Sequence, residues 1–337
     1  MPTLSSATPT QALLGLALLL AGGCAGSAPS VQSPTGAAPQ PPIAEEPTVE
    51  APVVEPEAPA AAEAPVTPTW TVTSETEAAL GSRTWRTLTL EGALDEGALS
   101  ASGTVWLYAP PELADAPILV GLPGWKFSST TWEEHAAIGE LADRHGFRLA
   151  LIDMNVSIYE SSFYPETAPG YRWCGPDCGI PGARWVGEVV APYLRTQGHI
   201  AGLFGLSTGG RGAVLLPQLY PGLADRACAM SGTYDLFDLP PGGELQIHQV
   251  IYGSREQHPD RWRRDDTLAQ ADRLEGLSAL VIHGALDGVV SPSQSQRLVD
   301  TMRDRGLTAE LILEPGGGHD WALWSKHLPT CFEFFAR

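Results

Sequence analysis

The sequence predicts an α/β domain in which a mostly parallel sheet of about eight strands is flanked by helices. Six of its apolar runs are continuous, which is typical of parallel strands that are buried on both faces. Helical patterns separate these runs, and this order favours right-handed crossovers onto one sheet. Before them, runs at 84–92 and 103–110 alternate in polarity and indicate two antiparallel strands with one exposed face.

Strand and helix patterns then follow one another to the C-terminus. The expected parallel strands are 116–124, 147–155, 199–207, 225–232, 278–287 and 309–317. The expected helices are 131–145, 183–196, 209–219, 291–305 and 321–335. Residues 233–275 are longer than a crossover needs, so we expect them to form a small cap or pocket wall over the sheet edge.

The first 24 residues have the pattern of an export signal. The apolar stretch at 11–21 is shorter than the roughly 20 residues that span a membrane, and it is typical of a signal peptide. It leads through small residues into Cys24 and resembles the lipobox of bacterial lipoproteins, which implies lipidation of Cys24. The alternative is ordinary signal cleavage near Ala25, with Cys24 discarded.

A linker and one folded domain are expected after the signal. Residues 25–69 contain eleven prolines, six glutamates and no Lys or Arg, so they should form an extended, disordered spacer. Residues 70–337 are long enough for one sizeable core. Removing the six linker glutamates from the net charge of −19 leaves −13, which disfavours nucleic acid as a partner.

The cysteines fit an exported chain. Apart from Cys24 there are four, an even number: Cys174, Cys178, Cys228 and Cys331. Cys174 and Cys178 lie in a tight loop and could pair, whereas Cys228 could be a buried free thiol, so the sequence leaves the pairing open. Because no second His/Cys pair accompanies the loop, we expect no metal. No cofactor is expected either.

The stretch Gly205-Leu206-Ser207-Thr208-Gly209 is the first candidate for chemistry. The composition, with 36 glycines, predicts roughly 0.25 chance matches to G-x-S-x-G, so position decides its meaning. Ser207 ends an expected strand and precedes a helix, where a sharp turn exposes a nucleophilic hydroxyl. The N–H of Thr208 at the helix start would stabilise an oxyanion.

A base and an acid follow in the order that this chemistry needs. A serine hydroxyl is activated by a base, and the base is oriented by an acid. Asp287 ends the expected strand at 278–287, and His319 follows the one at 309–317. Taken singly, Asp287 could form only a turn and His319 could be a solvated loop histidine. Together with Ser207 they predict a catalytic triad at the carboxyl ends of strands.

Other residues are weaker candidates for the site. The N–H of Trp125, after the strand at 116–124, is the expected second oxyanion donor, and its side chain either lines the site or only packs. His283 lies inside a strand, Asp320 points away from any base, and Glu314 is a fallback acid. Arg211 either packs its helix or reaches the site. Four residues could shape the pocket or be purely structural: Tyr159, Tyr164, Trp173 and His248.

These motifs resemble the α/β-hydrolase serine esterases, especially the esterase D-like and mycolyltransferase-like group. GLSTGG is similar to their nucleophile elbow, and GGGHDWALW resembles their histidine segment. LVGLPGW resembles their first oxyanion loop, although Pro123 replaces the usual His or Asp. VIHGALDGVVSPSQSQRLVDTMRDRG is similar to the acid segment of dienelactone hydrolase and prolyl oligopeptidase relatives. The resemblance covers about residues 100–337 and implies the α/β-hydrolase fold.

The resemblance also implies an activity. It is ester hydrolysis through an acyl-enzyme, in which Ser207 attacks, His319 moves the proton, and Asp287 orients His319. The amides of Trp125 and Thr208 would hold the oxyanion. The expected protein is an exported serine carboxylesterase of the bacterial cell envelope, acting on a small-molecule or polymer-linked ester and either membrane-anchored or secreted. Alternatives are a serine peptidase, an acyltransferase, or a non-catalytic surface binding module; acyl length and oligomeric state stay open.

Overall fold

The computed structural model describes residues 70–337 except 95–98, 154–155, 163, 165–166 and 168–180. The predicted signal peptide, the linker at 25–69 and the predicted lipidation site Cys24 lie outside the described residues. So do three residues of the loop that the sequence singled out: Trp173, Cys174 and Cys178.

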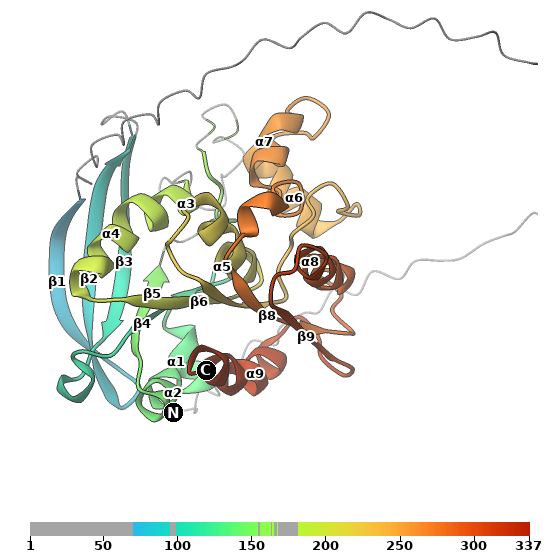
Figure 1. Ribbon diagram of the computed structural model, residues 1–337. Helices are drawn as coiled ribbons and strands as arrows, with labels where there is room; N and C mark the ends of the chain where they lie inside the picture. The colour runs from blue at the N-terminus through green and yellow to red at the C-terminus, as the bar shows by residue number, and fades with distance from the viewer. Residues whose placement is uncertain (1–69, 95–98, 154–155, 163, 165–166, 168–180) are drawn as a thin grey trace, which may run out of the picture. The chain divides into compact units, whose positions relative to one another are not determined.

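One nine-stranded sheet organises the described residues (Figure 1). In chain order its strands are β1 (Trp70–Leu80), β2 (Arg83–Leu94), β3 (Leu99–Tyr108), β4 (Ile118–Leu122), β5 (Arg148–Asp153), β6 (Ile200–Leu206), β7 (Arg226–Met230), β8 (Ser278–Gly284) and β9 (Ala309–Glu314). In space their order is β1-β2-β3-β5-β4-β6-β7-β8-β9. The pairs β1–β2, β2–β3 and β3–β5 are antiparallel. All the other pairs, beginning with β5–β4, are parallel.

Strand β1 is the element that the sequence analysis missed. About eight strands were expected and nine are present, because β1 adds a third antiparallel strand before the parallel part. Most of its residues are exposed, so its sequence lacks the apolar alternation that reveals a half-buried strand. A register shift between Val72 and Ser74 interrupts its pairing with β2 further. An exposed edge strand of this kind gives little hydrophobic signal.

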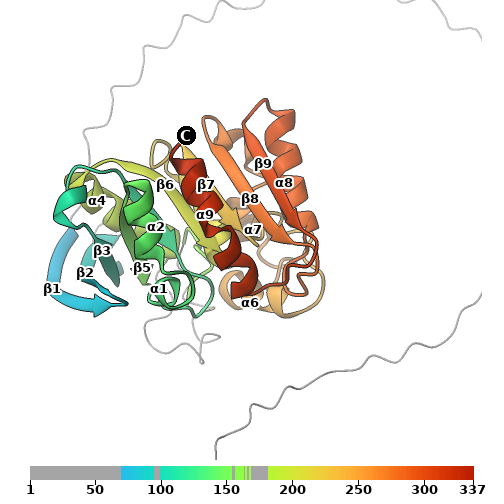
Figure 2. The ribbon, with the colours of Figure 1, turned by 90° about the horizontal axis from the view of Figure 1, so that it is seen from below.

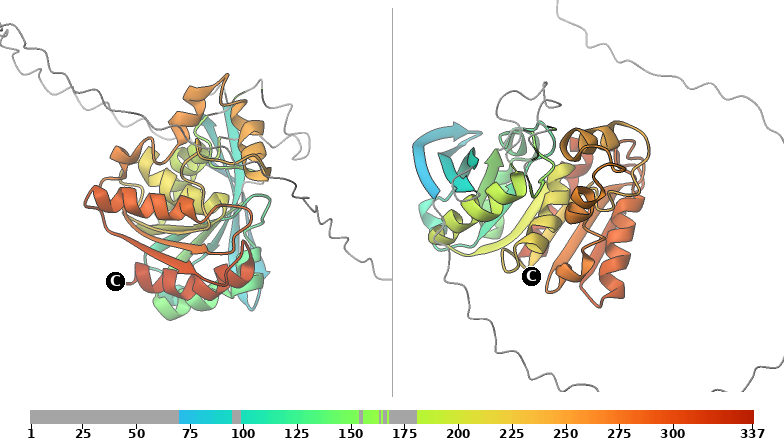
Figure 3. Two further views of the ribbon diagram at one scale, coloured as in Figure 1. Left: turned by 90° about the vertical axis from the view of Figure 1, so that its right-hand side faces the viewer. Right: turned by 90° about the horizontal axis from the view of Figure 1, so that it is seen from above.

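Helices cover both faces of the sheet (Figures 2 and 3). One face carries α3 (Gly182–Arg184), α4 (Ala191–Gln197), α5 (Thr208–Leu219) and α8 (Ser293–Asp304). The other carries α1 (Thr131–Ala136), α2 (Ile138–His145) and α9 (Trp321–Phe335). In the part of the chain that the structure describes, no helix is both long and apolar enough to span a membrane.

Two expected helices are interrupted. The segment 131–145 contains two helices, because Ala137 adopts a left-handed conformation with φ of 45° between α1 and α2. The segment 183–196 passes from α3 through a π-helix at Trp185–Val190 into α4. Ala137 carries no helix-breaking signal. Gly187 lies in the π-helix and Pro192 in the first turn of α4, where proline is tolerated, so neither residue by itself indicates that the helix is interrupted.

The core lies in two layers, one on each side of the sheet. Val189, Val214 and Leu298 belong to the cluster beneath α4, α5 and α8. Trp132 and Phe332 belong to the cluster beneath α1, α2 and α9. The central strands contribute to both clusters, as strands covered on both faces should. The predicted α/β sheet with helices on each side is confirmed.

A disulfide crosses one of these layers. Cys228 of β7 is bonded to Cys331 of α9, and both residues are fully buried. The bond excludes the alternative that Cys228 is a free thiol. It joins two elements that are 103 residues apart in sequence.

The long insertion at 233–275 forms a small cap beside α5. It contains α6 (Gly243–Tyr252), α7 (Pro259–Asp265) and a 3-10 helix at Ala271–Leu274. The insertion has its own apolar cluster, in which Tyr252 and Trp262 are fully buried against Ile158. The predicted small cap is therefore confirmed as a helical insertion with a packed apolar cluster.

Candidate active site

Ser207 sits on a strained turn between β6 and α5. Its φ of 54° and ψ of −121° lie in a region that residues with a side chain rarely occupy. Its N–H donates to the carbonyl of Met230 at 2.8 Å, which fixes the turn. A Cβ at Gly205 would come closer than 3.0 Å to the backbone of Gly209, and one at Gly209 would meet that of Leu122. Glycine is therefore required at both positions of the motif.

The structure brings the three predicted triad residues together at the carboxyl edge of the sheet. Nε2 of His319 lies 3.0 Å from Oγ of Ser207, and Nδ1 of His319 lies 2.7 Å from Oδ2 of Asp287. Since the Asp287 carboxylate can only accept, Nδ1 carries the proton and Nε2 is left to accept from the Ser207 hydroxyl. This is the tautomer that a general base needs.

Asp287 is held as a carboxylate by several donors. Its side chain is fully buried, and burial opposes ionisation, but hydrogen bonds from His283 and His319 outweigh this effect and hold its pKa well below the usual range. Its Oδ1 also accepts the backbone N–H groups of Val289 and Val290, at 2.8 and 2.9 Å. The orientation of the acid is thus fixed from two sides.

His283 is a residue of the site that sequence reasoning set aside. It lies in β8 and is fully buried, with Nε2 at 3.2 Å from Oδ2 of Asp287 and 3.1 Å from the carbonyl of Val290. Both partners are acceptors, so Nε2 carries the proton, while Nδ1 lies 2.7 Å from Oγ of Ser295. Its spacing of four residues before Asp287 is the signal that could have marked it.

The loop after β4 lies against the serine. A Cβ at Gly124 would stand 3.2 Å from Cβ of Ser207, which shows how closely the two backbones approach. Trp125 and Thr208, the two predicted oxyanion donors, line the same cavity as Ser207. Trp125 also packs against the apolar cluster of the cap.

A cavity of about 350 Å³ opens beside Ser207 and His319. Aromatic side chains dominate its wall: Trp125, Phe127, Trp321 and Trp324. Ile247 of the cap and Val289 complete the apolar part, and two carboxylates, Glu244 and Asp320, also line it. Sequence reasoning did not single out Glu244, Ile247 or Val289, because they lie far apart in the chain and carry no motif.

Arg211 packs the helix rather than the cavity. Its side chain is fully buried, and its guanidinium donates to the carbonyls of Ile158 and Asp265 and to the hydroxyl of Tyr252. These bonds tie the first turn of α5 to the cap. Of the two alternatives for Arg211, the structure supports packing.

The remaining candidates lie outside the cavity or act as structure. Glu314 accepts from Lys326 and contacts His327, so it is not the acid of His319. Asp320 caps α9 by accepting the N–H of Leu323, although it also reaches the cavity wall. Three other predicted pocket residues, Tyr159, Tyr164 and His248, pack outside the cavity wall. Among the described residues, no group of three His, Cys, Asp or Glu is arranged for a metal.

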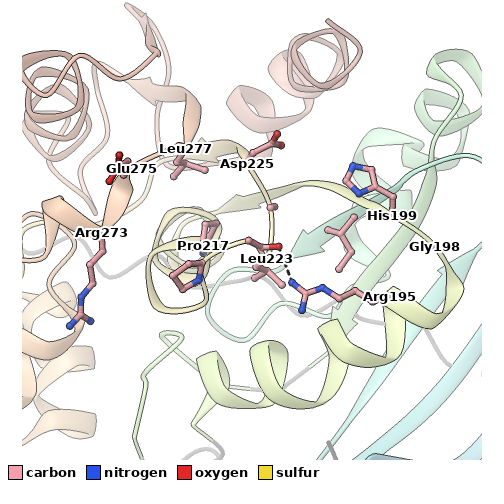
Figure 4. A pocket seen from close by; sticks show the side chains of 14 residues that line it. Arg195, Gly198, His199, Pro217, Leu223, Asp225, Arg273, Glu275 and Leu277 are labelled. Carbon is pink, nitrogen blue, oxygen red and sulfur yellow. Dashed lines mark hydrogen bonds between the residues drawn. The ribbon is translucent and has the colours of Figure 1, made fainter. Parts of the chain in front are cut away.

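A second and larger cavity lies at the opposite edge of the sheet (Figure 4). It measures about 650 Å³ and is lined where β6, β7 and β8 begin, with Ile200, Leu223 and Leu277 among its apolar residues. Its charged and histidine side chains are all exposed: Arg195, His199, Asp225, Arg273 and Glu275. It contains no residue that the sequence predicted for the site.

Comparisons with known proteins agree with this architecture. The family described as the prolyl oligopeptidase family matches residues 189–334. An S-formylglutathione hydrolase from Agrobacterium tumefaciens superimposes with a TM-score of 0.60 at 14% identity, over 79% of this chain and 98% of that one. The chain has the α/β-hydrolase fold. The resemblance that the sequence motifs indicated is confirmed at this level.

Two further solved structures share the α/β-hydrolase fold. A fluorophosphonate-binding serine hydrolase from Staphylococcus aureus gives a TM-score of 0.56 at 16% identity, over 75% of this chain and 99% of that one. The MPT51 protein of Mycobacterium tuberculosis gives 0.57 at 15% identity, over 70% and 92%. No curated protein sequence matches the chain.

Proposed function

We propose that this protein is a serine hydrolase that cleaves carboxylic esters through an acyl-enzyme. His319 takes the proton of Ser207 through Nε2 as Oγ attacks the ester carbonyl, and Asp287 stabilises the imidazolium that forms. The same proton then passes to the departing alcohol. Water, activated in turn by His319, attacks the acyl-enzyme and releases the acid, which returns Ser207 to its starting state.

The amides of Thr208 and Trp125 would hold the oxyanion of each tetrahedral intermediate. Thr208 begins α5, where unpaired backbone N–H groups and the helix dipole favour negative charge. Gly124 lets the loop after β4 approach Ser207 closely, and the next residue, Trp125, lines the cavity beside Ser207. Donors preorganised in this way stabilise the charge only as it develops.

One observation carries the proposal. The hydrogen bonds from Ser207 through His319 to Asp287 are unbroken, at 3.0 and 2.7 Å, and they end beside a cavity large enough for an acyl group. Three residues from three different strand ends meet in this arrangement. A non-catalytic binding module would have no need to keep all three.

Labelling and turnover test the proposal together. A fluorophosphonate should modify Ser207 alone, and p-nitrophenyl acetate should be hydrolysed with an initial burst equal to the labelled fraction. Peptide mapping locates the label, and stopped-flow absorbance follows the burst. Labelling of another residue, or an intact protein that neither reacts nor hydrolyses esters, would support a binding module instead.

A peptidase is the second candidate, and the match of residues 189–334 to the prolyl oligopeptidase family favours it. Amides need protonation of a poorer leaving group, which His319 could also supply. A panel of matched p-nitrophenyl esters and p-nitroanilides separates the two functions. Turnover of the anilides at a rate comparable to the esters would overturn the esterase proposal.

We also propose that the protein is exported and anchored through Cys24. The apolar stretch at 11–21 and the small residues before Cys24 support this, and the buried disulfide between Cys228 and Cys331 is typical of oxidising compartments. Labelled palmitate should be incorporated in a bacterial host and be lost in Cys24→Ala. A cleaved but unmodified chain would contradict anchoring and leave secretion as the route.

A further inference from the structure

One carboxylate in the cavity wall is buried and has no cationic partner in the part of the chain that the structure describes. Glu244 lies in the first turn of α6 and is only 9% exposed, and it lines the cavity together with Ser207 and His319. Its Oε1 accepts from the hydroxyl of Thr233 at 2.5 Å. Among the described residues, no Lys or Arg forms an ion pair with it or lines the cavity.

His248 does not neutralise this charge. Its Nδ1 lies 2.9 Å from the backbone carbonyl of Glu244 and 3.6 Å from the carboxylate. The carbonyl can only accept, so Nδ1 carries the proton, and Nε2 is buried without a hydrogen-bond partner among the described residues. Burial lowers the pKa of His248, so the ring stays neutral near pH 7. Among the described residues, no cationic side chain therefore pairs with the Glu244 carboxylate at the cavity.

The aromatic rings of the cavity wall pack against one another and against neighbouring side chains. Trp321 and Trp324 meet edge to face with centroids 5.5 Å apart, and Phe127 contacts both at 6.0 and 6.1 Å. Nε1 of Trp324 donates to Ser231, and the ring of Trp321 stacks on His135 at 4.6 Å. The faces of such rings attract cations, most strongly when several enclose one site.

From this combination we infer that the substrate of the site carries a positively charged amine or quaternary ammonium group, with Glu244 as the residue that selects it. The inference rests on the proposed ester hydrolysis and names its substrate class. A neutral acyl chain would satisfy the aromatic wall but leave the carboxylate buried beside apolar surface, which is unfavourable. A cationic group satisfies both, because it faces the carboxylate and the rings together.

A structural role alone does not explain Glu244. An acid in the first turn of a helix is favourable, and the Thr233 hydroxyl needs an acceptor, but an exposed acid or a neutral Gln would meet these needs. Glutamine has the same shape and can still accept from Thr233. Glutamate differs from glutamine at this position only in its negative charge, and a cationic ligand is the group that this charge would attract.

Two thioesters of equal shape test the inference. Acetylthiocholine carries a quaternary nitrogen where 3,3-dimethylbutyl thioacetate carries carbon. We expect the wild-type protein to favour acetylthiocholine by at least about tenfold in kcat/KM, and Glu244→Gln to reduce that ratio about tenfold, the size of one desolvated charge contact. Fluorophosphonate titration counts the competent sites in each preparation. Equal kcat/KM values for the two thioesters in the wild type would overturn the inference.

A matched control and a binding measurement separate the possible failures. Glu256→Gln removes the same charge from the cap without touching the cavity wall, so its substrate ratio should equal that of the wild type. Calorimetry with benzyltrimethylammonium needs no turnover, and we expect binding that weakens about tenfold in Glu244→Gln because one charge contact is lost. Unchanged binding in that variant would overturn the inference even if esters are hydrolysed. Weakened binding without ester turnover would instead reject the proposed hydrolysis and keep the cation site.

Discussion

The two cavities at opposite edges of the sheet differ in a way that size does not reveal. The cavity at the amino ends of the strands is the larger, at about 650 Å³ against about 350 Å³, yet its charged side chains are all exposed. The smaller one adjoins Ser207, His319 and the buried Glu244. Buried polar groups beside a nucleophile therefore distinguish the candidate site better than volume does.

The residues around the two cavities also differ in how deeply their polar groups are buried. Arg211, Asp265 and Glu160 are buried in one hydrogen-bonded region: Arg211 donates to the carbonyls of Asp265 and Ile158, and the N–H of Ile158 donates to Glu160. Ser207 adds a strained backbone at the same place. Burial and strain both cost stability, whereas the exposed charges around the larger cavity cost almost nothing. The strained nucleophile turn is found at the edge with the smaller cavity, whereas the charged side chains that line the larger cavity are exposed.

Ser207→Ala gives the largest expected effect. Loss of the nucleophile should reduce kcat/KM for p-nitrophenyl acetate by at least about 10⁴-fold, because no other group can form the acyl-enzyme. Steady-state kinetics of purified protein measure this. Arg273→Ala at the larger cavity is the matched control and should stay within twofold of the wild type. Comparable losses of kcat/KM in both variants would contradict the assignment of the reaction to the smaller cavity alone.

His283→Leu should have the next largest effect. It removes the Nε2 donor from Asp287, so we expect kcat to fall about tenfold to a hundredfold, the size of a hydrogen bond to a charged group, while KM changes little. His283→Gln can still donate and should recover part of kcat. A rise in KM with kcat preserved, or no recovery with Gln, would show that His283 serves packing and not the orientation of Asp287.

Glu160→Gln tests the cost of buried charge through pH. Burial raises the pKa of Glu160 to about 7, so the folded protein holds its proton more tightly than the unfolded chain. This contribution to stability is complete below about pH 4.5 and is lost as pH rises through about 7, a fall of order 3 kcal/mol that the variant should not show. Urea unfolding at the two pH values measures it. In Glu275→Gln, at the larger cavity, the pH dependence should match the wild type.

Ala224→Trp should have the smallest effect. Ala224 lines the larger cavity, so an indole there occupies part of its volume. If that cavity has no part in ester hydrolysis, kcat/KM for p-nitrophenyl acetate should change less than about twofold, in the range of surface substitutions. Kinetics and a melting curve on the same sample separate activity from stability. A tenfold loss in a stably folded variant would assign the larger cavity a role in the reaction.

The sequence predicted those parts that leave a local pattern. Buried parallel strands are continuous apolar runs, and Ser207, Asp287 and His319 each follow such a run, so both fold and site order could be read. Strand β1 could not, since its exposed side chains carry no apolar period. Glu244 and Val289 reach the cavity through tertiary packing alone. His283 was set aside because a strand position does not show which side-chain atoms face the acid.

The disulfide between Cys228 and Cys331 affects what a proteolytic cut in the cap would do to the protein. Cys228 and Cys331 close a covalent ring that contains Asp287, His319 and the whole cap, while Ser207 lies just outside it. A single proteolytic cut in the cap would open this ring without releasing a fragment, because the bond still joins the two pieces. Acid, base and substrate wall would then stay beside the nucleophile until the bond is reduced.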